Sequence, residues 1–208
     1  MDLINFILHI DKHLTDFVAE HGTWVYGLLF AIVFVETGVV VMPLLPGDSL
    51  LFAAGAIAAR GQMDPLLLTA LLTAAAVIGD NCNYFIGRYL GPRVFERESR
   101  WIKREYLLKT HAFFELHGPK AIIIARFMPI IRTFTPFIAG VGSMSYRRFL
   151  MFDIFGGALW VSVCVWAGFF FGNIPVVQKN FTLVIFGIIG VSLLPGVIAY
   201  LRRDKTPA

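Results

Sequence analysis

The 208-residue chain is 57% hydrophobic and only 15% charged, whereas about 25% of the residues in a soluble domain are charged. It contains several apolar runs of about 20 residues, the length that crosses a bilayer, so the composition indicates an integral membrane protein and excludes an ordinary soluble domain. The net charge of +4 is small, and most basic residues flank the apolar runs, where membrane orientation explains them. Nucleic-acid binding is therefore not indicated.

In chain order, the first segment is amphipathic. Over 1–23, apolar residues recur at helical spacing opposite charged ones, which predicts a helix lying at the membrane interface. The remaining segments are transmembrane runs at 24–42, 65–87, 149–172 and 181–201, apolar but broken runs at 43–59 and 119–142, and a basic segment at 88–118.

Orientation follows from lysine and arginine, which mark cytoplasmic loops. Basic residues concentrate in 88–118, in the stretch SMSYRR and near the C-terminus, whereas the loops 60–65 and 173–180 hold one each. With the basic loops inside, both ends of 119–142 are cytoplasmic and both ends of 43–59 are outside. These two runs are therefore predicted to enter the membrane and return, and the C-terminus to be cytoplasmic.

The predicted fold is an all-α integral membrane protein with about four transmembrane helices and two re-entrant helical hairpins that enter from opposite faces. Each hairpin precedes a full span, which makes an inverted repeat. Such broken segments, at matching positions of two halves, are typical of a transporter site near the midplane. The residues expected to break the hairpins are Pro43, Pro46, Gly47, Pro129 and Pro136.

Five ionisable residues are predicted to lie at membrane depth: Glu36, Asp48, Asp80, Arg126 and Arg132. Each costs about 2.5–3.5 kcal/mol at a helix centre, so we expect them to pair or to face water. A guanidinium is a rigid fork of donors that suits phosphate, and Arg126 and Arg132 therefore form a candidate phosphate clamp. Three acids against two arginines leave one carboxylate in excess, which predicts proton or ion exchange at Glu36 and Asp48.

Structural roles remain open for the same acids. Asp48 is placed to cap a helix that begins near Ser49, and Glu36 and Asp80 could serve only to neutralise an arginine.

Further supporting positions are predicted around this site. They are Ser49, Asp80, Tyr84 and Arg88. The last three recur on one helix face, although Tyr84 also fits an interface anchor. Asp153 is expected near the cytoplasmic surface, in a structural role beside Arg147 and Arg148.

No enzyme, metal site or cofactor is expected. The two cysteines lie in apolar runs without a Cys/His cluster of ligand spacing. All five histidines lie outside the predicted spans, and the stretch GDSL is not the G-x-S-x-G of a hydrolase nucleophile.

Four stretches carry a family resemblance over roughly 20–175: ETGVVVMPLLPGDSLLFAAG, GDNCNYFIGRYLG, FFELHGPKAIIIARFMPIIRTFTPFIAG and SMSYRRFLMFDIFGGALW. Together they resemble the DedA family of bacterial inner-membrane proteins. The resemblance implies an inner-membrane location, re-entrant hairpins, and a role in envelope integrity that depends on the proton-motive force. Some members translocate undecaprenyl phosphate, and eukaryotic relatives scramble phospholipids.

The resemblance also implies functional importance for Glu36, Asp48, Arg126 and Arg132, which match acids and arginines that family members need. Asp153 departs from the pattern, since many members have asparagine there. The predicted function is a flippase or transporter of a phosphorylated lipid, coupled to protons or monovalent cations and compatible with a homo-oligomer. The alternatives are a proton-coupled small-ion antiporter and a structural or assembly factor of the membrane.

Overall fold

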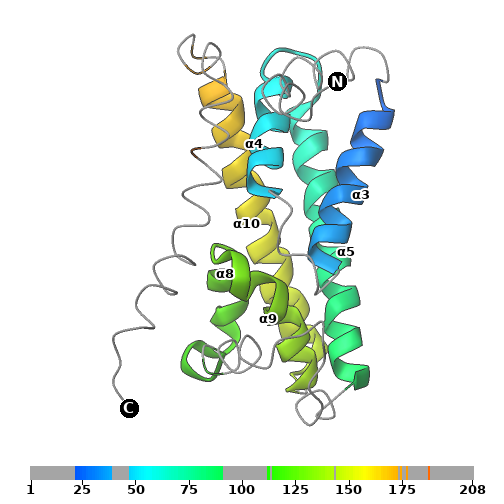
Figure 1. The fold of residues 1–208 in the computed structure, drawn as a ribbon, viewed down its shortest axis with the longest axis vertical. Helices are drawn as coiled ribbons and strands as arrows, with labels where there is room; N and C mark the ends of the chain where they lie inside the picture. The colour runs from blue at the N-terminus through cyan, green and yellow to red at the C-terminus, as the bar shows by residue number, and fades with distance from the viewer. Residues whose placement is uncertain are drawn as a thin grey trace, which may run out of the picture.

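The computed structural model describes residues 22–38, 47–90, 114–142 and 144–172, together with the single residues 112, 174, 177 and 187. Every regular element in that part of the chain is a helix (Figure 1). The elements are α3 (Trp24–Gly38), α4 (Gly47–Ala58), α5 (Pro65–Leu90), the 3-10 helix η1 (Gly118–Lys120), α8 (Ala121–Ala125), α9 (Pro129–Val141) and α10 (Tyr146–Gly172).

Some predicted features lie outside the described residues. These are nearly all of the interfacial helix 1–23 and the last span 181–201, most of the basic segment 88–118, and the breakers Pro43 and Pro46.

Two helices in the described ranges, α5 and α10, are long and apolar enough to cross a membrane. They have 26 and 27 residues, and at about 1.5 Å per residue each exceeds the roughly 30 Å of hydrocarbon in a bilayer. Large apolar side chains remain exposed on both, among them Leu66, Phe85, Phe155 and Phe170. α3 has 15 described residues, and the predicted span 181–201 lies outside the described residues apart from residue 187, so the structure supports two of the four predicted spans.

The short helices α4 and α9 begin in the interior of the molecule (Figure 1). α4 carries Asp48 in its first turn, where a carboxylate favours the positive end of the helix dipole. α9 begins with Pro129 after an extended Met128, an arrangement that suits proline because the first helical N–H needs no partner. From starts near mid-height, α4 and α9 run toward opposite ends of the molecule (Figure 1).

The predicted run 119–142 is interrupted at 126–128, where α8 ends in a turn before α9 begins. Pro136, which was expected to break the same segment, lies inside α9, and the helix continues through it. The helix is interrupted at this turn rather than at Pro136.

α4 packs on α10 at backbone contact distance. A Cβ added to Gly55 would lie 2.0 Å from the carbonyl oxygen of Val165, and one added to Gly168 would lie 2.0 Å from that of Phe52. Because no side chain fits in such a gap, these two glycines set how closely the helices approach.

The pair α5 and α9 repeats this contact. A Cβ added to Gly140 would lie 2.1 Å from the carbonyl oxygen of Tyr84, and one added to Gly87 would lie 2.2 Å from that of Phe137. The equivalent positions are Phe52 and Phe137, Gly55 and Gly140, Tyr84 and Val165, and Gly87 and Gly168. The two helix pairs therefore use the same packing contact at these four positions.

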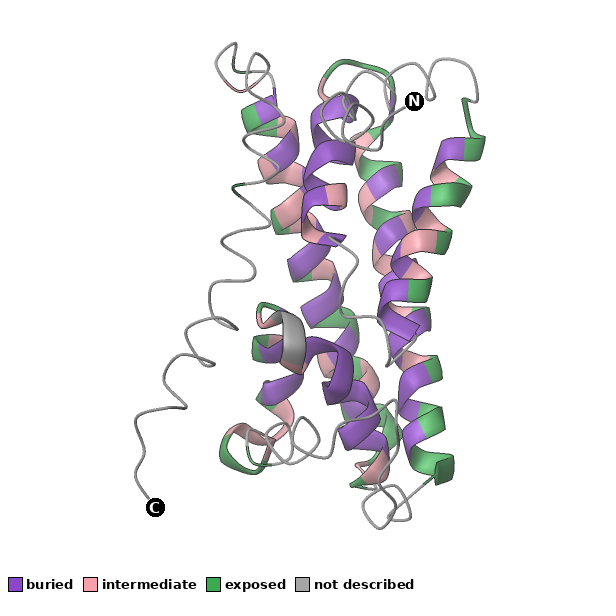
Figure 2. Cartoon of the chain, in the orientation of Figure 1, coloured by how far each residue is buried: buried purple, intermediate pink, exposed green. Residues whose placement is uncertain are grey.

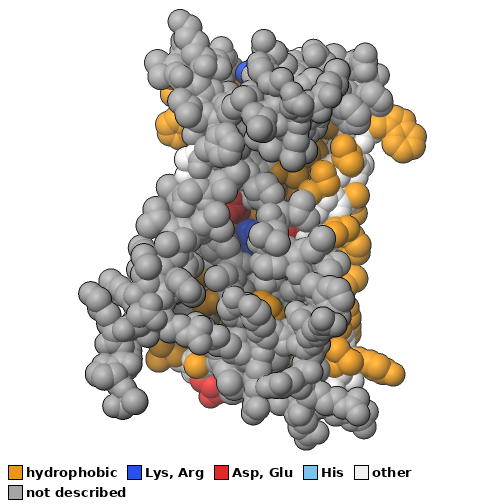
Figure 3. Space-filling view, in the orientation of Figure 1, with side chains coloured by type: hydrophobic (Ala, Val, Ile, Leu, Met, Phe, Trp, Pro, Cys, Tyr) orange, Lys and Arg blue, Asp and Glu red, His pale blue; other side chains and the backbone are white. Residues whose placement is uncertain are grey.

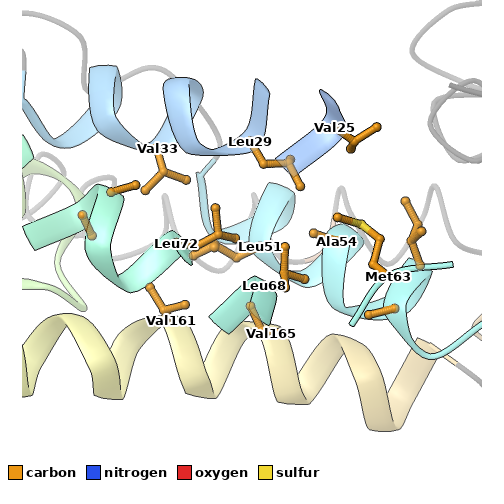
Figure 4. Close-up of a cluster of buried hydrophobic side chains, with 14 of the residues drawn as sticks. Val25, Leu29, Val33, Leu51, Ala54, Met63, Leu68, Leu72, Val161 and Val165 are labelled. Carbon is orange, nitrogen blue, oxygen red and sulfur yellow. The ribbon is translucent and has the colours of Figure 1, made fainter. Parts of the chain in front are cut away.

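The main apolar core fills the space between α3, α4, α5 and α10 (Figure 4). Val33, Leu51, Leu72 and Val161 from these four helices are wholly buried there. Figure 2 shows the buried residues on the facing sides of the helices and the exposed ones on the outer sides of α3 and α5.

The glycine contacts generate a first prediction. Gly55→Ala and Gly87→Ala should each destabilise the protein by about 1–3 kcal/mol, because a methyl group meets a backbone carbonyl that cannot turn aside. Gly27→Ala on exposed α3, where an added Cβ meets nothing within 4 Å, is the matched control and should be neutral or slightly stabilising. Thermal unfolding in detergent measures all three, and equal midpoints for Gly55→Ala and Gly27→Ala would contradict the packing.

Candidate functional site

Two clusters of buried charged residues lie around the starts of α4 and α9. We call the first the Arg132 cluster, comprising Glu36, Asp48, Arg132 and Trp160. The second, the Arg126 cluster, comprises Asp80, Asn81, Arg126 and Asp153. The five residues predicted to lie at membrane depth are divided between the two.

In the Arg132 cluster, one guanidinium joins three helices. Its Nη2 donates to Oε1 of Glu36 at 2.5 Å, and its Nη1 donates to Oδ1 of Asp48 at 2.9 Å. Glu36 comes from the end of α3, Asp48 from the first turn of α4, and Arg132 from the first turn of α9. The arginine therefore fixes the starts of α4 and α9 against the end of α3.

Trp160 of α10 completes this cluster. Its indole Nε1 donates to Oδ1 of Asp48 at 2.8 Å, and its ring lies 4.8 Å from Cζ of Arg132. The ring thus positions the acid by a hydrogen bond and the base by a cation–π contact. Sequence reasoning missed Trp160, because one tryptophan in an apolar run gives no sign that its N–H has an ionic partner.

Gly47 makes room for Glu36. A Cβ at Gly47 would lie 1.9 Å from Oε2 of Glu36, so a side chain at the start of α4 would displace the acid. That oxygen is buried and has no hydrogen-bond partner among the described residues. Gly47, predicted as a helix breaker, therefore also provides space for the carboxylate.

In the Arg126 cluster, two carboxylates share a single nitrogen. Nη2 of Arg126 donates to Oδ2 of Asp80 at 2.6 Å and to Oδ1 of Asp153, and it lies 3.3 Å from the Asp153 carbonyl oxygen. The amide of Asn81 lies 3.4 Å from Oδ2 of Asp153. The turn between α8 and α9 is thereby tied to α5 and α10.

The expected position of Asp153, beside Arg147 and Arg148, was wrong. Asp153 is fully buried and pairs with Arg126, whereas Arg147 and Arg148 are exposed. Two turns into α10, its side chain lies among the packed helices rather than beside the basic loop. Four acids, not three, thus surround the two arginines, and Glu36 and Asp48 both pair with Arg132.

The other predicted supporting residues have separate positions. The Tyr84 hydroxyl donates to the Met144 carbonyl oxygen, its ring stacks on Phe149, and Nη1 of Arg88 lies 3.1 Å from the same hydroxyl. Tyr84 and Arg88 therefore anchor the end of α5 to the start of α10. Ser49 is buried in the first turn of α4, next to Asp48.

The clusters are chemically suited to anion binding only under one condition. With every acid ionised, each cluster carries one more negative than positive charge, so an anion must displace a carboxylate or bind while an acid is protonated. The Asp48 side chain is 22% exposed, against 1% for Glu36, which makes the Arg132 cluster the more accessible one. Figure 3 shows charged side chains at mid-height on one face, beside an apolar flank.

Among the described residues, no group of three or more His, Cys, Asp or Glu side chains could hold a metal ion.

The division into two clusters predicts the energetic coupling between residues. In a double-mutant cycle, Glu36→Gln and Arg132→Gln should show a coupling free energy of about 0.5–3 kcal/mol, because they share an ion pair. The cycle of Glu36→Gln with Arg126→Gln should be closer to additive. Unfolding free energies in mixed detergent measure both cycles, and a larger coupling to Arg126 would contradict the assignment.

Trp160 generates a separate prediction. Trp160→Phe keeps an aromatic ring near Arg132 but removes the N–H donor to Asp48, so stability should fall by about 1–3 kcal/mol. Trp166→Phe, in the same helix but outside the cluster, is the control. Similar unfolding midpoints for the two variants would show that the indole hydrogen bond contributes little.

Comparisons with known proteins give the family of the chain. Residues 45–170 match the family model of the VTT domain. The chain is 53% identical to Protein DedA of Escherichia coli K12, over 99% of this chain and 95% of that protein. It is 38% identical to the inner membrane protein YghB of the same organism, over 75% and 72% of the two chains.

A further relative is an uncharacterized membrane protein of Mycobacterium tuberculosis H37Rv, 46% identical over 87% of this chain and 81% of that one. No solved structure matches the chain. Two helices long and apolar enough to span, together with relatives named as membrane proteins, identify a membrane protein. The chain belongs to the VTT-domain family that includes DedA.

Proposed function

We propose that the protein moves a lipid with a phosphate head group across the bacterial inner membrane. Undecaprenyl phosphate or a phospholipid is the cargo, and protons or monovalent cations are the coupling ions. The observation that carries this proposal is the pair of guanidinium groups buried where α4 and α9 begin, with Arg126 and Arg132 only 3% and 8% exposed. In the proposed topology the molecule has four spans and two re-entrant hairpins, and the C-terminus is cytoplasmic.

The helix geometry supports an anion site between the hairpins. α4 and α9 both begin in the interior, and the N-terminus of a helix carries partial positive charge and unpaired N–H groups. In transporters, broken helices direct such ends at anionic parts of the substrate near the midplane. The first turns of α4 and α9 are linked here by Arg132 and Asp48.

The chemistry of the charged residues supports phosphate. The planar guanidinium fork binds two oxygens at once, a geometry that phosphate and carboxylate both offer. In this structure carboxylates take those positions, so they stand where phosphate oxygens would bind. The exposed apolar faces of α5 and α10 suit acyl or prenyl chains, which can remain in the bilayer while the head group crosses.

Coupling between cargo and ion follows because phosphate and the carboxylates of Glu36 and Asp48 compete for Arg132. When phosphate replaces a carboxylate on Arg132, the freed Glu36 or Asp48 must take up a proton or a cation, since an unpaired buried charge is costly. Cargo binding and ion binding are then linked at one guanidinium.

The excess of acids over arginines keeps a small-ion antiporter as the second candidate. It would use the same acids without any lipid. Vesicles lacking the candidate lipid, loaded with a pH-sensitive dye, separate the two functions, because cation-driven proton flux in those vesicles supports the antiporter.

The direct test uses reconstituted vesicles and labelled undecaprenyl phosphate. Arg132→Gln should reduce transfer about tenfold or more, equivalent to about 1.4 kcal/mol of lost stabilisation, because the amide cannot bind two oxygens as a cation does. Arg147→Gln, at an exposed arginine, is the matched control and should transfer at the wild-type rate. Wild-type transfer by an Arg126→Ala/Arg132→Ala double variant would exclude the phosphate clamp.

A further inference from the structure

The Arg126 cluster contains more buried negative charge than its cation can balance. Asp80 is 3% exposed and Asp153 is wholly buried. Their nearest oxygens contact the same nitrogen of Arg126, so the two carboxyl groups are close neighbours. Two ionised carboxylates this close, sharing one cation away from water, repel each other strongly.

No second cation among the described residues offsets that repulsion directly. Asn81 is neutral, and its amide contacts the Val77 carbonyl oxygen and Asp153. From α9, Arg132 acts on Asp80 at longer range, but it is bound to Glu36 of α3 and Asp48 of α4. Lys120 of η1 is exposed. Among the described residues nothing else balances the pair, which makes a bound proton the candidate counter-charge.

The Arg132 cluster differs although it also has two acids. There the two branches of the fork take one acid each, which separates the carboxylates. Asp48 also accepts the Trp160 indole N–H and is partly exposed. The need for a bound proton is therefore greater at Arg126.

Arg126 has unused donors that point to a ligand. Its Nε and Nη1 are buried and have no hydrogen-bond partner among the described residues, a costly state for a charged group. Gly156 and Gly157 pack closely against this side chain, since an added Cβ would lie 3.2 and 3.3 Å from Arg126 atoms. The cluster thus combines an excess of acid with spare donors for an oxyanion.

We propose that Asp80 and Asp153 share one proton and form a proton-binding site distinct from Glu36 and Asp48. The proton comes from water and is held between two carboxyl oxygens, so the cluster becomes neutral. This proposal rests on the proposed function, and it assigns the Asp80–Asp153 pair a role in coupling proton binding to phosphate binding. The protonated, neutral cluster accepts a phosphate oxygen on its spare donors, and loss of the proton leaves a net negative charge that repels it. Proton and lipid phosphate are then carried in the same direction.

Infrared spectroscopy of the purified protein tests the proton directly. At neutral pH the wild type should show the carbonyl stretch of a protonated carboxyl group, shifted in D₂O. Asp153→Asn and Asp80→Asn should each remove this band, because the remaining acid forms a simple ion pair with Arg126. Asp48→Asn should retain it. A band that persists in Asp153→Asn, in protein that elutes as folded, places the proton elsewhere and overturns the proposal, as does the absence of a band in the wild type.

The coupling role is tested by the pH dependence of dodecyl phosphate binding. Above the pH at which the pair ionises, wild-type affinity should fall by up to about tenfold per pH unit, the limit for one linked proton. Asp153→Asn keeps the cluster neutral, so its affinity should fall less over the same range. Equal pH dependence in the two proteins would refute the coupling role. If the wild type fails to bind dodecyl phosphate or to transfer lipid phosphate, the proposed function fails, while the infrared band still decides the proton site.

Discussion

The packing of the helices depends on one constraint, the pairing of two buried guanidinium groups with four carboxylates. Arg132 joins α9 to α3 and α4, and Arg126 joins the turn before α9 to α5 and α10. A buried charge that loses its partner costs about 3–5 kcal/mol, so each arginine holds its helices strongly. Interrupted helices expose unpaired backbone groups, and such interruptions are tolerated at membrane depth only inside protein or against a wet cavity. The buried charges and the helix interruptions therefore both require a place enclosed by protein or facing a wet cavity.

Close backbone packing provides the frame in which these charges meet. The glycine contacts of α4 with α10 repeat in α9 with α5, so the two helix pairs pack alike around these glycines, although α4 begins five residues before Phe52 and α9 begins eight residues before Phe137. The charges placed on this symmetric frame are complementary rather than equal, since the first turn of α4 carries Asp48 and that of α9 carries Arg132. The starts of α4 and α9 thus carry opposite charges, and Arg132 pairs with Asp48 between them.

The sequence was sufficient for the class of protein, the family, the apolar runs that became α5 and α10, and five of the six charged residues that pair in the two clusters. It could not assign the pairs, because Glu36 and Arg132 meet only through tertiary packing. Asp153 was misplaced because a basic loop lies close to it along the chain, although the helix turns its side chain inward. Pro136 was over-interpreted, since a proline inside an apolar helix can be accommodated. The number of spans and the re-entrant course of the hairpins remain predictions.

The character of the two arginines bears on the choice between an anionic lipid and a small cation. A pathway for cations gains from carboxylates but is opposed by a fixed positive charge, and a guanidinium stays charged at any physiological pH. Both clusters place such a charge at the centre of their acids, where a metal cation would have to approach it closely. A proton is the exception, because it can reside on a carboxyl oxygen without approaching the guanidinium. The same arrangement thus disfavours a sodium-like ion within the clusters and suits a proton together with an oxyanion, which is the combination that a proton-coupled carrier of lipid phosphate requires.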